Sequence, residues 1–191
     1  MDHVGRIKKV PFLAVLLFVF AVSAVHPDSD DIGFSVFFEG SWVFPIGFSF
    51  YPGAELTFYS FEVNDRTALS VGGAVTGQVA YANRTDLWSF TNLGAALGPL
   101  AVVTFQEAAD SYTRFWERVE LSFSPGLAFN YYIYAGDPAY YANRDTFTVG
   151  FAGFAGARLR LSRFFLIRLD ATYWGRYIGP NIAIGAQLDL W

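Results

Sequence analysis

The sequence predicts an all-β fold, an eight-stranded antiparallel up-and-down β-barrel that follows a helical signal peptide. Two observations favour this class. After residue 31 the dominant pattern is an alternation of apolar and polar residues with period two, which is typical of strands with two unlike faces. The chain is also 53% hydrophobic and 19% aromatic but only 16% charged, against roughly 25% charged in an average soluble domain. We expect one barrel domain, at residues 32–191.

The N-terminus has the three-part order of a secretory signal peptide. Its first part holds the basic residues Arg6, Lys8 and Lys9. An apolar run from Val10 to Val22 follows, before the small residue Ala24. A transmembrane anchor is the alternative, but the run has about 13 residues and a spanning helix needs roughly 20. We therefore expect cleavage after Ala24, which makes residues 1–24 the signal peptide and residues 25–31 a short leader.

Four segments of the first half alternate between apolar and polar residues. They span residues 32–43, 54–63, 68–81 and 88–106. The first places Phe34 and Phe38 opposite Ser35 and Glu39, and Phe37 is an exception on the polar face. The second loses its alternation in its second half, so its bounds are the least defined. The third alternates most clearly, and each of the four is long enough to be a strand.

Four further segments alternate in the second half. They span residues 115–134, 146–160, 164–176 and 182–191. In the third of these, Phe165 and Ile167 alternate with Arg168 and Asp170. The last segment alternates from Ile182 to Leu190, and Trp191 then follows Leu190 directly with the parity of the polar face.

The connections predict how the barrel is oriented. Three connections between the segments span residues 64–66, 108–114 and 161–162. A fourth connection, at residues 135–145, is long and rich in Tyr, Asn and Asp. With both chain ends on the periplasmic side, the first three become periplasmic turns and the long connection becomes an external loop.

Two prolines leave the strand count open. Pro99 and Pro125 each fall inside a long predicted strand, where a closed barrel has no free edge to accommodate the missing N–H group. If the two strands pair as an antiparallel hairpin with its turn near residue 112, the prolines lie opposite each other. This register predicts a shared bulge or kink. The alternative is that each proline marks a turn, which would give ten shorter strands.

The polar face indicates which side of the barrel is apolar. That face consists mainly of Gly, Ala, Ser and Thr, which fit the crowded interior of an eight-stranded barrel. The chain after Lys9 contains no lysine, although a soluble charged surface would normally include it. We therefore expect the apolar face to point outward to lipid, which makes the fold a transmembrane barrel. A secreted soluble barrel that binds ligands, as lipocalins do, is the alternative.

These features resemble the small outer-membrane barrels of the OmpA-transmembrane, OmpX and OmpW type. The signal peptide, the eight segments and the C-terminal run from Ile182 to Trp191 carry the resemblance. It implies a bacterial outer-membrane protein that is exported through the inner membrane and contacts outer-membrane lipid. It also implies that the barrel assembly machinery recognises the last strand. The residues of this assembly signal are Ile184, Leu188, Leu190 and Trp191.

Charged residues with inward parity are the candidates for a functional site. They are Glu39, Glu55, Arg118, Glu120, Arg158, Arg160, Arg168 and Asp170. Unpaired charges in a narrow interior would each cost several kcal/mol, so we expect these residues to form ion pairs. The network then either plugs the barrel or acts as the gate of a narrow pore.

The remaining chemistry is sparse, and three functions stay open. The chain has no cysteine, and its one histidine after the signal peptide is His26, in the leader. We therefore expect no enzyme, no metal site, no cofactor and, without a basic patch, no nucleic acid partner. The first function is a structural or surface-exposed barrel with a largely plugged lumen, whose external loops contact host or envelope partners. The alternatives are a small channel for ions or hydrophobic solutes and the soluble ligand-binding barrel.

Overall fold

The computed structural model describes six stretches of the chain. They are residues 32–42, 47–85, 88–105, 115–136, 146–175 and 180–190. All of them belong to one compact unit, Asp31–Trp191. The predicted signal peptide, the predicted leader, residues 137–145 of the predicted external loop and Trp191 lie outside the described residues.

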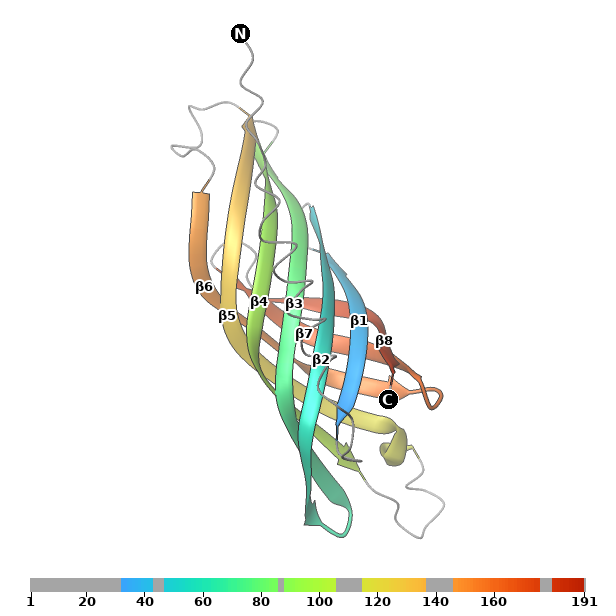
Figure 1. The fold of residues 1–191 in the computed structure, drawn as a ribbon. Coiled ribbons are helices and arrows are strands. Elements are labelled where there is room, and N and C mark those ends of the chain that lie inside the picture. The colour runs from blue at the N-terminus through green and yellow to red at the C-terminus, as the bar shows by residue number, and fades with distance from the viewer. Residues whose placement is uncertain are drawn as a thin grey trace. The chain divides into compact units, whose positions relative to one another are not determined.

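Eight antiparallel strands form a closed ring (Figure 1). They are β1 Gly33–Trp42, β2 Gly47–Asn64, β3 Thr67–Thr85, β4 Trp88–Phe105, β5 Val119–Gly136, β6 Thr146–Arg160, β7 Phe165–Trp174 and β8 Pro180–Asp189. Each strand pairs with the next in sequence, and β1 pairs with β8 to close the sheet. The predicted eight-stranded up-and-down barrel is confirmed, and the ten-stranded alternative is wrong.

Within the described residues, the structure contains no helix with the length and apolar character needed to cross a membrane.

The two strand prolines share one interruption of the sheet. Pro99 of β4 and Pro125 of β5 lie opposite each other, as predicted, where pairing between the strands is absent at residues 98–100 and 124–126. Pairing resumes beyond this point with the register unchanged, so the interruption is a gap in the ladder and not a bulge with an extra residue. A Cβ atom on Gly98 would collide with the Pro125 carbonyl oxygen. Glycine therefore lets the two backbones approach where the prolines supply no N–H donor.

Strand β2 differs most from its predicted bounds of 54–63. It begins at Gly47, and its register with β3 shifts between Thr57 and Tyr59 and again between Glu62 and Asn64. An extra residue in a strand reverses the parity of all residues after it. Phe58 and Tyr59 are consequently both exposed, which explains why the alternation of this segment decays.

Strand β5 begins later than predicted, and this corrects the placement of one candidate residue. A one-turn 3₁₀ helix, η1 at Trp116–Arg118, precedes Val119, and the Arg118 backbone N–H donates to the Phe115 carbonyl oxygen at 3.0 Å. The residues of this turn do not follow strand parity. Arg118 is therefore exposed, and the prediction that it points inward is wrong.

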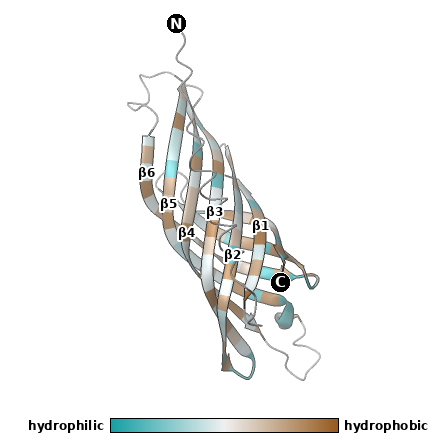
Figure 2. Ribbon diagram, in the orientation of Figure 1, coloured by the Kyte–Doolittle hydropathy of each residue, from teal (hydrophilic) through white to brown (hydrophobic). Residues whose placement is uncertain are grey.

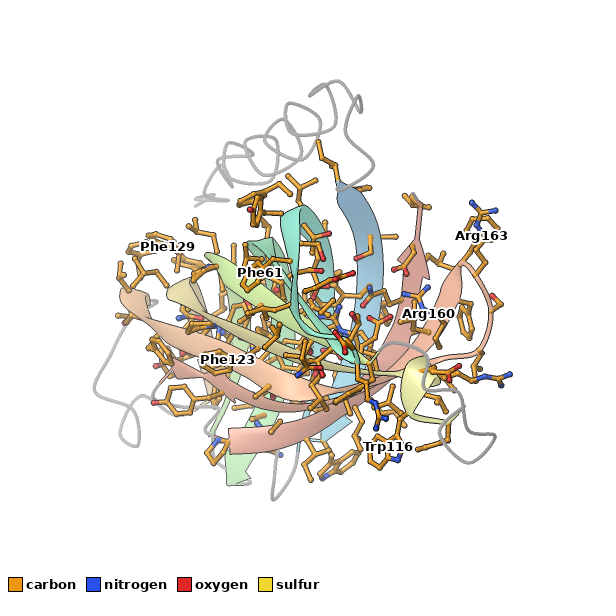
Figure 3. All side chains as sticks on the ribbon, turned by 90° about the horizontal axis from the view of Figure 1, so that it is seen from below. Phe61, Trp116, Phe123, Phe129, Arg160 and Arg163 are labelled. Carbon is orange, nitrogen blue, oxygen red and sulfur yellow. The ribbon has the colours of Figure 1, made fainter. Side chains whose placement is uncertain are left out.

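Large apolar side chains cover the outside of the ring. Strand β7 alternates perfectly, with Phe165, Ile167 and Leu169 exposed and the residues between them buried. Phe123 and Phe129 of β5 are likewise exposed on the outer side of their strand (Figure 3). Figure 2 shows the same alternation as brown and paler segments along the strands. The inside of the barrel, its lumen, receives the polar and small residues together with a few large aromatic ones.

A layer of aromatic and amide side chains crosses the lumen. Its aromatic residues include the fully buried Tyr51, Tyr132 and Trp174. The Trp174 Nε1–H donates to Asn130 Oδ1 at 2.6 Å, and Asn92 Nδ2 donates to the same oxygen at 2.9 Å. Asn130 Oδ1 thereby accepts two hydrogen bonds, which link side chains of β4, β5 and β7 across the lumen.

Candidate functional site: a buried ion-pair cluster in the lumen

Arg168 of β7 is the centre of a charged cluster inside the barrel. Its guanidinium group forms ion pairs with Glu39 at 3.0 Å, with Glu55 at 2.9 Å and with Asp170 at 2.7 Å. These carboxylates come from β1, β2 and β7, and all four side chains are buried. The cluster therefore connects β7 with β1 and β2 through side chains inside the barrel.

A second arginine shares one of these carboxylates. Arg158 of β6 lies directly opposite Arg168 in the sheet, which places two positive side chains next to each other. Glu55 Oε1 accepts from Arg158 Nη2 at 2.7 Å and from Arg168 Nη1 at 2.9 Å. Because the shared carboxylate lies between them, the two guanidinium groups are held together without an uncompensated repulsion.

Uncharged side chains complete the surroundings of Arg168. The Phe37 ring stacks on its guanidinium group, with Arg168 Cζ 3.9 Å from the ring centroid. Gln187 Oε1 accepts from Arg168 Nη1 at 3.1 Å. A Cβ atom on Gly53, which pairs with Phe37, would collide with that ring. The glycine therefore makes room for the aromatic ring that covers the cation.

A smaller charged group lies nearer the end of the barrel. Arg160 of β6 pairs with Glu120 of β5 and, at 2.8 Å, with Asp189 of β8. The Arg160 side chain is 33% exposed, whereas the Arg168 side chain is 2% exposed. Arg160 is labelled in Figure 3.

A polar cavity of about 220 Å³ is lined by residues of both charged groups. Its lining includes Glu55 and Arg158 from the cluster and Glu120, Arg160 and Asp189 from the smaller group. Strands β1 and β8 reach this cavity with their ends, at Gly33 and Asp189. A polar space of this size holds several water molecules.

The structure brings seven of the eight predicted charged residues into these two groups, and Arg118 is the exception described above. The sequence-based set did not include Phe37, Gln187 or Asp189. The sequence did carry a signal for Phe37, because it is an apolar residue on the polar face of β1. Gln187 and Asp189 lie on the polar face of the last segment, so the sequence could also have predicted that both point into the lumen.

The predicted assembly signal lies on the last strand. Ile184, Leu188 and Leu190 are exposed on its outer side, and Trp191 lies outside the described residues. A row of exposed apolar residues on a strand is a surface that another protein or lipid can contact.

Comparisons with protein-family models and with curated proteins gave no match. Several solved structures are similar to the chain. Ail, the attachment invasion locus protein of Yersinia pestis, has 14% identity and a TM-score of 0.46, covering 84% of this chain and 98% of that one. The N-terminal β-barrel domain of Pseudomonas aeruginosa OprF has 12% identity and a TM-score of 0.40, covering 85% and 98%. The outer membrane enzyme PagL has 12% identity and a TM-score of 0.43, covering 81% and 97%.

The cluster predicts a large difference between two arginine variants. Arg168→Ala leaves Glu39, Glu55 and Asp170 without their shared cation, so we expect a loss of about 3–5 kcal/mol of unfolding free energy. Arg118→Ala, its matched control at an exposed position, should change the unfolding free energy by less than about 0.5 kcal/mol.

Urea unfolding of the detergent-folded protein, followed by tryptophan fluorescence, measures both changes. Equal losses in the two variants would contradict the assignment of Arg168 as the centre of the cluster.

Proposed function

We propose that this protein is an integral β-barrel of the bacterial outer membrane, with a closed lumen and a structural or surface-exposed role. The single observation that carries the proposal is the distribution of side chains over the two faces of the wall. Large apolar residues are exposed around the outside, while charged residues are buried inside.

The outer face is suited to acyl chains and unsuited to water. Exposed apolar residues occur on every strand, and they include Phe38, Phe50, Val79, Leu97, Leu127, Phe151, Leu169 and Ile184. Soluble monomers rarely expose contiguous apolar patches larger than a few hundred Å². A soluble ligand-binding barrel would place these residues inside and its charges outside, which is the reverse of this arrangement. The soluble alternative is therefore disfavoured.

The filled lumen supports a structural role over a conducting one. The aromatic layer with Tyr51 and Trp174 and the cluster around Arg168 each cross the lumen with buried side chains. An ion that passed would have to displace both. A plugged barrel of this kind presents its outer connections and strand ends to partners instead of transporting a solute.

A gated channel is the second candidate, and one observation favours it. The polar cavity of about 220 Å³ extends from the strand ends at Gly33 and Asp189 to Glu55 and Arg158, so part of a conduction path is wide enough for water. Opening would require the ion pairs of Arg168 to separate and the aromatic layer to move.

We also propose how the protein reaches the membrane and which partners it contacts there. Cleavage of residues 1–24 follows export through the inner membrane, and the assembly machinery recognises the apolar face of β8. Partners from the host or the envelope bind the external connections, and the barrel itself performs no catalysis. The composition of the N-terminus supports export, and the exposed Ile184, Leu188 and Leu190 support recognition of the last strand.

Two substitutions by arginine on the outer face test whether that face contacts lipid. Leu127 lies in the middle of β5, and Phe115 lies in the turn before it, and the two are similarly exposed, at 55% and 58%. In a bilayer Leu127→Arg should cost about 2–4 kcal/mol of folding free energy, because a charge at mid-depth must be removed from water. Phe115→Arg should cost about 0–1 kcal/mol, because it lies near the interface.

Urea unfolding in lipid vesicles measures this difference. A protein whose outer face contacts water would tolerate both substitutions equally, and this result would remove the membrane proposal.

Recordings across planar lipid bilayers distinguish the two candidate functions. The wild-type protein with a closed lumen should give no stepwise current at either voltage polarity, because two filled layers block the path. Reproducible current steps that disappear when the protein is heat-denatured before addition would replace the structural role with the gated channel.

A further inference from the structure

Two carboxyl groups of the lumen cluster lie against the same nitrogen of Arg168. Glu39 of β1 and Asp170 of β7 are both fully buried, and Arg168 Nε lies 3.0 Å from Glu39 Oε1 and 3.2 Å from Asp170 Oδ2, so the two carboxyl groups lie next to each other. Among the described residues, no group donates a hydrogen bond to either oxygen of Glu39 or to Asp170 Oδ1. An ionised carboxylate only accepts hydrogen bonds, so two of them cannot bond to each other unless one carries a proton.

The net charge of the cluster also indicates a proton on one carboxyl group. Arg158 and Arg168 contribute two positive charges, and Glu39, Glu55 and Asp170 would contribute three negative ones. A surplus buried charge costs several kcal/mol. A single proton on one carboxylate makes the cluster electrically neutral.

Among the described residues, Arg158 and Arg168 are the only buried cations. Strand β7 contributes Arg168 and Asp170 to the surroundings of Glu39, and Arg158 of β6 joins the cluster through Glu55. Strand β2 contributes Glu55 and, as the cross-strand neighbour, the uncharged Tyr51. On β8, Gly185 packs against Glu39 and carries no side chain.

The hydrogen bonds of Arg168 identify which carboxyl group holds the proton. Asp170 Oδ2 accepts from Arg168 Nη2 at 2.7 Å and from Arg168 Nε at 3.2 Å, and such charge-assisted bonds favour the ionised form. Glu39 is 3.0 Å from Arg168 Nε but accepts no well-aligned hydrogen bond. Glu39 is therefore the better donor and Asp170 the better acceptor.

We infer that the lumen holds one bound proton at neutral pH, carried by Glu39 and donated in a hydrogen bond to Asp170. The cluster is thus a proton-binding site inside the barrel wall. When the proton leaves at alkaline pH, the cluster carries an uncompensated negative charge and the wall between β1 and β7 loses a hydrogen bond. The inference is independent of the conductance of the barrel and of its membrane location.

Infrared spectroscopy of the full-length folded protein in detergent at pH 7 tests the inference. A protonated carboxyl group has a carbonyl stretch that is separate from the bands of carboxylates and shifts in heavy water. The wild-type protein should show this band, and Glu39→Gln should remove it. Glu62→Gln, an exposed control on β2, should leave it unchanged. Absence of the band from the wild type, or its persistence in Glu39→Gln, would overturn the inference.

Unfolding in urea provides a second, independent measurement. Glu39→Gln keeps a neutral donor toward Asp170, so its urea midpoint at pH 7 should match that of the wild type. Glu55→Gln removes the charge shared by Arg158 and Arg168, so its midpoint should fall clearly. A Glu39→Gln midpoint as low as that of Glu55→Gln, or a failure of Glu39→Gln to fold, would show that Glu39 is needed as an anion and would refute the bound proton.

Discussion

The sorting of side chains between two environments underlies the whole structure. Successive residues of a strand point to opposite faces, and closure of the sheet into a ring makes one face the lumen and the other the outside. Strand β7 shows the result most simply, since Ile167 and Leu169 are exposed while Arg168 and Asp170 are buried. A slip of one residue would reverse both sets, so the register, the buried charges and the apolar surface depend on one another.

The charges in the lumen follow from this sorting. The interior of an eight-stranded ring is narrow, and a cation placed there requires anions from other parts of the wall. Arg168 obtains them from β1, β2 and its own strand, and the Phe37 ring covers it. The same cluster that fills the lumen thereby connects β7 with β1 and β2, so the filling of the lumen and the bracing of the wall have one physical cause.

Much of the fold was predictable from the sequence because most strands obey period two without interruption. Strand β6 has its predicted bounds of 146–160. The hairpin register of β4 and β5 correctly predicted that Pro99 lies opposite Pro125. Strand β2 was less predictable because its two bulges reverse the parity. Arg118 was misplaced because a 3₁₀ turn, which has another period, replaces the first part of the predicted strand.

The pairing within the candidate site could be predicted only in part. Parity places the charged residues inside, but the partners of each arginine depend on how the ring closes. Glu55 and Arg158 are 103 residues apart in sequence and meet only across the lumen. Phe37 and Gln187 have inward parity, but their contacts with Arg168 depend on how the strands are placed around the ring, which parity alone does not indicate.

A spin-label scan of β7 in lipid vesicles tests the central claim most directly. The chain contains no cysteine, so each of the positions 165–174 can be labelled through a single introduced cysteine. The outward orientation of apolar residues predicts frequent collisions with oxygen dissolved in the lipid, and few with a water-soluble nickel complex, at Ile167, Leu169 and Ala171. Frequent collisions with the nickel complex along that face, with oxygen contact low throughout, would contradict the account.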